Sequence, residues 1–535
     1  MKATDLLIQC LENEGVEYIF GIMGKETLDL MDSLSKSKKI QFINVRHEQG
    51  AAFMADVYGR LTNKVGVCLA TLGPGATNLL TGIASANLDH SPVVAITGQA
   101  GFERQLQESH QYLDIVKIFE PATKWSVQIK DSQSIPKIIR QAFRLAQMEK
   151  PGAVLIELPE NIASQMAPTL PLPVLPLPKS TPNSQAIEDA RTLISQSQKP
   201  LVIVGNGVIR QTAIHELLTF VENLQSPVIH SFMAKGVLPK NHPLNYFTFG
   251  FKKKDEVLPI IEQSDLLIVI GFDFVESAPK DWNKGMKPIL HIDTLPAEMD
   301  EHYPVKKELV GDLNETFQQL NAPDLPSKPW VPVGNLKEQI KTAYQIDLDV
   351  KENLSLTIEN ILTVIENNAT ENTIVISDVG AHKLSIARTY QSKQAGRLII
   401  SNGFASMGIA LPGSIGAKLA CPDAPVICIT GDGGALMNIS ELETAKRLGL
   451  SLIIIVLNDS TLKLEEQMMQ EKFSNSFGTA FGNPDFVQLA ESFGIAGVRP
   501  NQLNEFEQVL KNTLTQNNGI TLIDIKMGMD TQSTK

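Results

Sequence analysis

Short apolar runs alternate with amphipathic segments along almost the whole chain of 535 residues. Runs such as VGVCLATLG, PLVIVGNG and APVICITGDG are each followed by a helical pattern with apolar positions three or four residues apart. Apolar runs of about five to eight residues between amphipathic helices predict parallel strands that are buried on both faces. The pattern therefore predicts an α/β fold of doubly wound parallel sheets, with ligand sites at the carboxyl ends of the strands.

Two proline-dense stretches interrupt this alternation, at 167–182 (APTLPLPVLPLPKSTP) and, more loosely, at 322–332 (APDLPSKPWVP). Proline at this spacing holds a chain extended and unpaired, so both stretches are predicted to be linkers. They predict three doubly wound parallel-sheet domains, over residues 1–166, 186–322 and 345–535. All three have an ordinary domain size.

The charge and composition of the chain limit the classes of molecule that it is expected to bind. The formal net charge of −12 argues against nucleic acid, because no basic stripe offsets the acidic balance. No apolar run reaches the roughly 18 residues of a membrane-spanning helix, and MKATDLLIQCLENEGVEYIF lacks the apolar core of a signal peptide. The four cysteines form no CxxC pair, which favours buried, reduced thiols. We expect a cytoplasmic protein without nucleic-acid or membrane partners.

One segment, 425–461, predicts a phosphate and metal site: PVICITGDGGALMNISELETAKRLGLSLIIIVLNDST. Its first apolar strand ends in Gly431-Asp432-Gly433-Gly434 and its second ends at Asp459, with a capping-box spacing of Ser440 and Glu443 between them. In a right-handed βαβ unit both strands finish at the same edge of the sheet, so the two aspartates are expected side by side. Glycines let backbone amides approach a phosphate, and two carboxylates can hold Mg²⁺ against it.

This order of strand, GDG, helix, strand and Asn-Asp resembles the signature of thiamine diphosphate (ThDP) enzymes. The resemblance implies that Asp432, Asp459 and the Thr461 carbonyl bind Mg²⁺. It also implies cofactor contacts from residues beside these ligands and in the upstream segment VISDVGAHKL, namely Gly431, Gly433, Gly434, Leu462, Val379, Gly380 and His382. A surface histidine after a turn is the alternative for His382.

A second motif, FINVRHEQGAAFMADVYGRLT, places Glu48 where a strand meets a helix. On its own, a glutamate in a first helical turn most often interacts with the helix dipole. Together with GPGATNLLTGIASANLDHSPVVAITG (73–98), however, the motif resembles the pyrimidine-binding domain of acetolactate synthases. The resemblance implies that Glu48 shares a proton with N1′ of the aminopyrimidine, as general acid–base catalysis requires, and that Pro74 and Asn78 contact the cofactor.

The same family resemblance extends to SNGFASMGIALPG (401–413). It implies that Met407 wedges the cofactor into a bent shape and that the Ala405 carbonyl accepts a hydrogen bond from the 4′-amino group of the cofactor. Without the motif, core packing would be the ordinary role of a methionine. The chain is therefore identified as similar to ThDP enzymes throughout, with a pyrimidine-binding, a central Rossmann-like and a diphosphate-binding domain.

The reaction implied is that of an acetolactate synthase, because His110-Gln111 resembles the pattern in which Gln111 faces the substrate, whereas pyruvate decarboxylases have a His-His pair. Such enzymes decarboxylate pyruvate, a small 2-keto acid, through a ThDP enamine and join it to a second pyruvate to give 2-acetolactate. In this family the two halves of a site come from different subunits. A homodimer or homotetramer with active sites at the subunit interface is therefore expected.

A flavin in the central domain is disfavoured. Arg210 occupies the third glycine position of the GxGxxG pattern that starts at Gly205, and no acid follows the next strand, which ends near His230. The segment IGFDFVESAPKDWN (270–283) resembles the catabolic, FAD-independent type. FAD stays open as a lesser alternative, since anabolic acetolactate synthases bind it in another mode.

Several positions depart from the family pattern. Lys25 stands beside the expected reaction centre, where it is either a solvated charge or a partner for the substrate carboxylate. Glu465 falls where pyruvate decarboxylases have an active-site glutamate, and Lys463 and Met468 are also unusual. These residues keep two alternatives open: a non-ligating ThDP-dependent 2-keto acid decarboxylase, and a catalytically silent ThDP-fold subunit.

Overall fold

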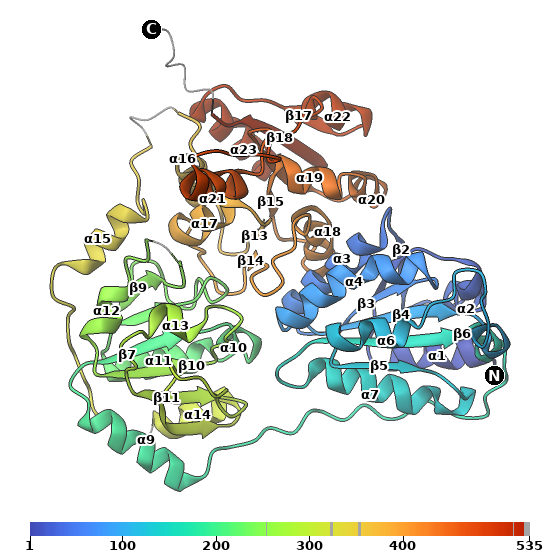
Figure 1. Cartoon of the computed structure of the whole chain (residues 1–535), viewed down its shortest axis with the longest axis horizontal. Helices are drawn as coiled ribbons and strands as arrows, with labels where there is room; N and C mark the ends of the chain where they lie inside the picture. The colour runs from blue at the N-terminus through green and yellow to red at the C-terminus, as the bar shows by residue number, and fades with distance from the viewer. Residues whose placement is uncertain (253, 322–324, 351–354, 517, 529–535) are drawn as a thin grey trace.

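The computed structural model describes the chain except for residues 253, 322–324, 351–354, 517 and 529–535. The described part forms three six-stranded sheets, and the strands that pair within them run parallel. Figure 1 shows the three domains around a common centre: the first in blue, the central one in green, the third in yellow to red. The predicted α/β class is therefore confirmed, while the exact domain boundaries stay predictions.

The first sheet has the order β2-β1-β3-β4-β6-β5. Its order reverses between β1 and β3, and in parallel sheets ligand sites form at such a reversal, at the carboxyl ends of the strands. Alternate residues of β3 pack into two different apolar clusters, so helices cover both faces of the sheet. The strands are β1 (Tyr18–Gly21), β2 (Gln41–Asn44), β3 (Gly66–Ala70), β4 (Val93–Gln99), β5 (Trp125–Gln128) and β6 (Ala153–Pro159), and the helices are α1 (Ala3–Asn13), α2 (Leu28–Ser35), α3 (Glu48–Thr62), α4 (Pro74–Leu88), α5 (Phe102–Gln105), α6 (Ile115–Phe119), α7 (Ile135–Gln147) and α8 (Glu160–Ala163).

The central sheet has the order β12-β11-β10-β7-β8-β9. The predicted linker 167–182 before it carries no helix or strand and is mostly exposed. The strands are β7 (Pro200–Val204), β8 (Val228–His230), β9 (Asn245–Thr248), β10 (Leu266–Ile270), β11 (Ile289–Asp293) and β12 (Val305–Val310), and the helices are α9 (Ser184–Gln196), α10 (Gly207–Arg210), α11 (Ile214–Leu224), α12 (Leu258–Gln263), α13 (Pro279–Trp282) and α14 (Leu313–Leu320). The second predicted linker falls partly outside the described residues; its part 325–332 has no regular structure.

The third sheet has the order β14-β13-β15-β16-β18-β17, which reverses between β13 and β15. Its strands are β13 (Ile374–Ser377), β14 (Leu398–Ile400), β15 (Val426–Gly431), β16 (Leu452–Asn458), β17 (Ala496–Val498) and β18 (Ile520–Lys526), and its helices, counted with α15 (Leu336–Ala343) of the connection, are α16 (Ile358–Asn368), α17 (Ala381–Thr389), α18 (Ala410–Ala420), α19 (Asp432–Met437), α20 (Glu441–Arg447), α21 (Lys463–Phe473), α22 (Phe486–Ser492) and α23 (Leu503–Gln516). The turns after β13 and β15 are those singled out in the sequence.

The first and third domains share one hydrophobic core. Residues of α3 and α18 belong to the same buried cluster, and Gly416 of α18 packs so closely that an added Cβ would lie 2.3 Å from the Met54 carbonyl oxygen. Another cluster joins the central and third domains. The relative placement of the three domains is thus fixed by buried apolar surface.

Two local predictions have clear outcomes. Ser440 is the N-cap residue of α20, as its spacing from Glu443 predicted, but the capping box itself is wrong: the backbone of Ser440 is already helical (φ −60°, ψ −22°) and its side chain makes no capping hydrogen bond. The cysteines are free, with Cys10, Cys68 and Cys428 buried. Among the helices described, none has both the length and the apolar character needed to cross a membrane.

Candidate active site

A cavity of about 500 Å³ opens at the carboxyl ends of β13, β15 and β16 in the third domain. Eleven of the positions predicted from sequence line it: Val379, Gly380, His382, Met407, Gly431, Asp432, Gly433, Gly434, Asp459, Thr461 and Leu462. They come from four separate segments that meet where the strand order reverses. Ligands bind at such a switch point because the loops there diverge to opposite faces of the sheet.

Asp432 and Asp459 lie together, as the βαβ argument predicted. Asp432 is buried, and its Oδ2 accepts hydrogen bonds from the backbone N–H groups of Asp459 (3.1 Å) and Ser460 (2.6 Å). Burial, followed by the nearby charge of Asp432, raises the pKa of the Asp459 carboxyl above its ordinary range. A bound cation would relieve this unfavourable proximity of two carboxyl groups.

The cavity wall also has buried polar atoms without a partner among the described residues. These are Nε2 of His382 and Oγ1 of Thr461. Burial lowers the pKa of His382 to about 4, so its imidazole is neutral in the free protein. Buried polar groups are normally satisfied, and unsatisfied ones that face a cavity indicate a polar ligand.

These donors suit a diphosphate held by Mg²⁺. The described residues contain no group of three His, Cys, Asp or Glu side chains that would hold a metal alone. Mg²⁺, however, usually takes one or two carboxylates and completes its octahedron with carbonyls, waters and phosphate oxygens. Asp432 and Asp459, with the Thr461 carbonyl, match that incomplete set, and Gly433 and Gly434 line the cavity without side chains that would block a ligand.

The loop that carries Ala405 and Met407 is held above this cavity by a buried carboxylate. Asp378, 1% exposed, accepts the N–H of Gly408 at Oδ1 (2.8 Å) and that of Val379 at the same atom (2.7 Å). Met407 reaches within 3.4 Å of the point where a Gly433 Cβ would lie. Ala405 adopts a left-handed φ of 52° and does not itself line the cavity among the described residues.

The predicted residues of the first domain gather where the strand order of its own sheet reverses. Glu48, 8% exposed, begins α3, and its Oε2 accepts a hydrogen bond from Asn78 Nδ2 of α4 (3.0 Å). The turn before Pro74 contains Gly73, where an added Cβ would lie 2.5 Å from the Gln111 carbonyl oxygen. Gln111 therefore packs over the start of α4, next to the Glu48–Asn78 pair.

Lys25 lies beside this group of first-domain residues. It is exposed and begins a short 3₁₀ turn (Lys25–Thr27), and the preceding Gly24 lies against Thr71, since an added Cβ there would meet the threonine side chain at 2.4 Å. Its neighbour Glu26 is buried and accepts from Thr71 Oγ1 at 3.2 Å. The structure thus assembles Lys25, Glu48, Pro74, Asn78 and Gln111 in one place.

Within one chain, the residues that line the third-domain cavity and the first-domain residues around Glu48 do not meet. No first-domain residue lines the third-domain cavity in the described part of the structure. The chain segment before Glu48 is instead tied to α20, because Glu441 Oε1 accepts the N–H groups of Arg46 and His47 at 3.0 Å each. The cavity and Glu48 therefore form two half-sites on different domains.

Comparison with known proteins agrees with this geometry. Families described as the N-terminal TPP binding domain, the central domain and the C-terminal TPP binding domain of thiamine pyrophosphate enzymes match residues 1–118, 187–320 and 378–525. Acetolactate synthase of Bacillus subtilis is 34% identical over 98% of this chain and 93% of its own length. A probable acetolactate synthase large subunit of Methanococcus aeolicus is 34% identical over 96% of this chain and 90% of its own. The chain belongs to the ThDP-dependent acetolactate synthase family.

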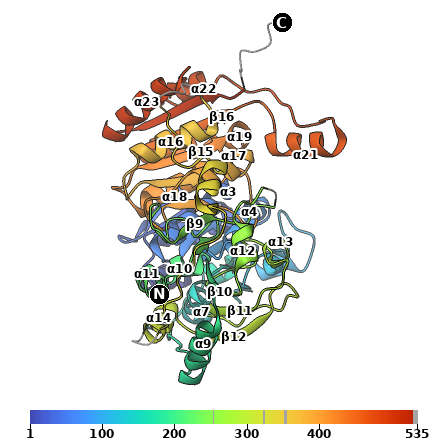
Figure 2. The same ribbon diagram turned by 90° about the vertical axis from the view of Figure 1, so that its left-hand side faces the viewer.

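As a member of this family the chain is a ThDP-dependent enzyme, and its departures from the family pattern can now be placed. Lys463 and Glu465 both line the cavity from the first turn of α21. Lys463 pairs with Glu466 (2.8 Å), whereas Glu465 and Met468 are exposed. Figure 2 shows α21 standing off the body of the third domain, and no residue of this helix is buried.

The sequence analysis did not single out two residues that support the predicted site. Asn483 donates from Nδ2 to Asp432 Oδ2 (2.7 Å) and so orients the proposed metal ligand. It arrives on a long loop with no motif, so nothing in the sequence indicated it. Asp378 did lie within a motif, directly before the diphosphate turn, and a buried aspartate between a strand and a glycine could have been recognised as a support for that turn.

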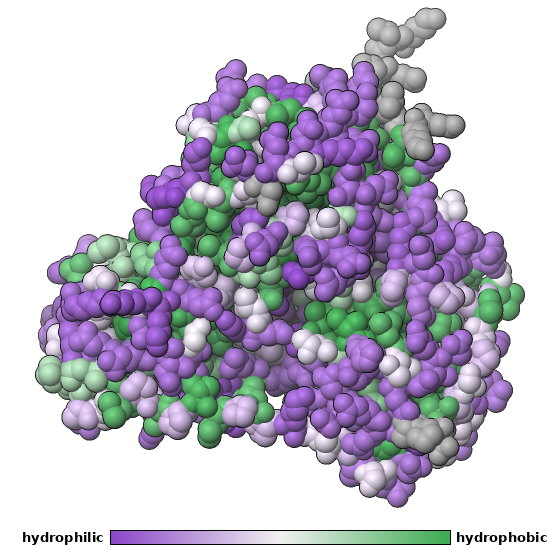
Figure 3. All heavy atoms as spheres, turned by 180° about the vertical axis from the view of Figure 1, so that it is seen from behind, coloured by the Kyte–Doolittle hydropathy of each residue, from purple (hydrophilic) through white to green (hydrophobic). Residues whose placement is uncertain are grey.

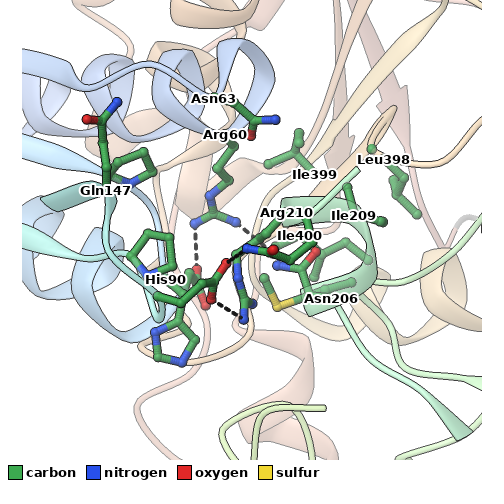
Figure 4. A pocket seen from close by; sticks show the side chains of 17 residues that line it. Arg60, Asn63, His90, Gln147, Asn206, Ile209, Arg210, Leu398, Ile399 and Ile400 are labelled. Atoms are coloured by element: carbon green, nitrogen blue, oxygen red, sulfur yellow. Dashed lines mark hydrogen bonds and ion pairs between the residues drawn. The ribbon is translucent and has the colours of Figure 1, made fainter. Parts of the chain in front are cut away.

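A second cavity, of about 170 Å³, lies where the three domains meet and contains none of the predicted site residues. Figure 4 shows Arg60 and Arg210 entering it from different elements. Both guanidinium groups are paired: Arg60 with Asp56 (2.7 Å) and Asp89 (2.8 Å), and Arg210 with Asp273 (2.5 Å). Arg60 also donates to the Ile400 carbonyl of the third domain, and Arg210 pairs with Glu149 of the first domain, so we assign this cluster to contacts that join the domains.

Proposed function

We propose that this acetolactate synthase joins two molecules of pyruvate, with loss of CO₂, in a site shared by two copies of the chain. ThDP, when bound, supplies a carbanion that attacks the keto carbon and a ring that accepts the electrons released with CO₂. The single observation that supports the proposal is the pair of half-sites: a cavity suited to a metal-bound diphosphate and a separate Glu48–Asn78 pair suited to a pyrimidine.

In the third domain, Asp432, Asp459 and the Thr461 carbonyl would hold Mg²⁺. His382 and the glycine turns would contact the diphosphate, and Met407 with the Ala405 carbonyl would orient the two rings. FAD stays disfavoured for the central domain, where Arg210 takes the place of the third glycine and is paired with Asp273.

In the first domain, Glu48 would exchange a proton with the pyrimidine ring nitrogen. Asn78 occupies Oε2 of the carboxyl group, which leaves Oε1 for the cofactor. A positioned carboxyl group of this kind typically contributes about 10² to 10⁴ in rate. Gln111 and Lys25 would face the second pyruvate, and the Lys25 ammonium group would pair with the carboxylate of that pyruvate.

Exposed apolar side chains support a homo-oligomer, at least a dimer. Several lie beside the two half-sites, at Met23, Leu28, Leu106, Phe404, Met437, Met468, Phe473 and Phe477. Figure 3 shows that the back of the molecule is mostly hydrophilic with separate hydrophobic patches. Large exposed apolar side chains beside a ligand site indicate a surface that another protein covers. A second copy would bury them and bring Glu48 to the cavity of its partner. A cytoplasmic location stays a prediction.

The product of pyruvate turnover tests the proposal. Purified chain, pyruvate, ThDP and Mg²⁺ should yield a product that acid treatment converts to acetoin. Release of acetaldehyde would instead assign the decarboxylase reaction, in which Glu465 protonates the substrate carbon. Bound ThDP without turnover of any 2-keto acid would indicate a catalytically silent subunit.

A further inference from the structure

The segment Ser401–Gly408 carries Ala405 and Met407, and it is tied to the first domain at its start. Asp89 is 1% exposed and directly follows α4. Its Oδ1 accepts hydrogen bonds from the backbone N–H groups of Asn402 (3.1 Å) and Gly403 (2.6 Å). Hydrogen bonds to an ionised acceptor are about twice as strong as neutral ones.

The carboxylate of Asp89 is itself held in place. Arg60, near the end of α3, donates from Nη2 to Asp89 Oδ2 (2.8 Å) and from Nη1 to the Ile400 carbonyl (3.3 Å). The remaining face of the guanidinium pairs with Asp56, one turn earlier on α3 itself. Arg60 therefore holds the last residue of β14, and Asp89 holds Asn402 and Gly403 at the start of the segment that follows.

The fit at this point leaves no room for adjustment. A Cβ added to Gly403 would lie 2.8 Å from the Leu88 carbonyl oxygen and 2.9 Å from Asp89 Oδ1. At its other end the segment is fixed by Asp378, which binds the Gly408 N–H, and by Asn438 Nδ2, which donates to the Gly408 carbonyl (2.8 Å). A chain of this length held at both ends has few conformations, and releasing one end restores them.

From these contacts we infer that Asp89 is a positioning residue: it fixes the start of the segment that presents Met407 and the Ala405 carbonyl to the cofactor. The inference rests on the proposed function, because it concerns the cofactor of that site. Each of α3 and α4 then contributes to the site at both of its ends. Their first turns carry Glu48 and Asn78, and their last turns hold the loop through Arg60 and Asp89.

The test compares Asp89→Ala with Asp56→Asn as matched control, since both remove a buried partner of Arg60 but only Asp89 touches the loop. ThDP affinity is measured by calorimetry with Mg²⁺, the exchange rate of the C2 proton of bound ThDP by NMR, and kcat and KM for pyruvate by product assay. Asp89→Ala should weaken ThDP binding about tenfold, as loss of charge-assisted hydrogen bonds implies, and slow C2 exchange and kcat by a similar factor with KM for pyruvate unchanged.

Asp56→Asn should lower the melting temperature while leaving ThDP affinity and C2 exchange within about twofold of wild type. A second variant, Gly403→Ala, pushes the loop away from Leu88 and Asp89 but removes no charged side chain, and it should reproduce the loss of affinity even if Asp89→Ala fails to fold. Unchanged affinity and exchange in Gly403→Ala, or equal losses in Asp56→Asn, would overturn the inference. Wild-type protein that binds ThDP and converts pyruvate preserves the proposed function whatever these variants show.

Discussion

Asn78 donates a hydrogen bond from Nδ2 to Oε2 of Glu48 over 3.0 Å, joining the first turns of α4 and α3. The bond fixes one oxygen of a buried carboxyl group and leaves the other, Oε1, facing the Gly75 backbone, where an added Cβ would lie at 3.3 Å. A flat ring can approach this glycine closely because it has no side chain. A pyrimidine ring that approaches this carboxyl group would explain why Glu48, Asn78 and Gly75 lie together.

Glu48→Gln should abolish acetolactate formation while ThDP still binds. The amide keeps the shape of the side chain but cannot exchange a proton, so kcat should fall by at least about 100-fold. Turnover and calorimetric ThDP affinity are measured on the same preparation. Glu17→Gln, which changes an exposed glutamate of the same domain paired with Lys64, serves as the control with normal activity. Turnover retained in Glu48→Gln would remove this residue from its role.

Mixing two inactive chains tests whether the site is shared. Glu48→Gln and Asp432→Asn should each be inactive alone, because one lacks the acid and the other a metal ligand. If each site takes Glu48 from one chain and Asp432 from the other, a mixed dimer has one intact site. Random co-assembly should then restore about a quarter of wild-type activity, since half of the dimers are mixed. No recovery, with mixed dimers verified by mass spectrometry, would place both residues of a site on one chain.

Lys235 should make the stability of the protein rise with pH. Its Nζ is fully buried and donates to the Thr248 hydroxyl (3.0 Å) and to the Ala387 carbonyl of α17 (2.6 Å). Burial lowers the pKa of Lys235 to about 7, well below the ordinary lysine value. Between that pH and about 10 the unfolded chain binds a proton that the folded chain does not, so stability from this group rises with pH by about 1.4 kcal/mol per unit and is lost as pH falls toward 7.

Urea unfolding at about pH 7, 8 and 9 measures this slope. Lys235→Met should have a smaller rise of the unfolding free energy with pH than wild type. Lys306→Met, at an exposed lysine of the central domain, should keep the wild-type slope. Parallel pH profiles of wild type and Lys235→Met would show that the lysine is charged inside the folded protein.

Much of the site could be predicted from the sequence because its residues directly follow the ends of strands. Gly431 to Gly434 and Asp459 follow two apolar runs, and the rule that parallel strands end at one edge was enough to bring the two aspartates together. The capping box at Ser440 failed for a local reason: Ser440 does stand at the N-cap of α20, but its backbone is already helical, whereas a capping side chain needs an extended backbone at that position.

Residues that contact the site from distant parts of the chain could not be predicted from the sequence. Asn483 orients Asp432 from a loop 51 positions away, and Asp89 holds Gly403 from another domain, 314 positions away. Asn483 lies on a loop without a motif, and Asp89 lies within the motif 73–98, but no local pattern indicates that either side chain reaches another segment of the chain. Only the packing of α3 and α4 against the third domain gives these side chains their contacts.

The sequence by itself determined the three parallel sheets, the turns that bear the site and the chemistry of those turns, because hydrophobic period and strand-end motifs are local properties of the chain. The tertiary structure alone decided which loops support the site and showed that Glu48 and the Asp432–Asp459 cavity lie apart within one chain. The reason is physical. The placement of whole domains depends on summed burial at their interfaces, which no single segment encodes.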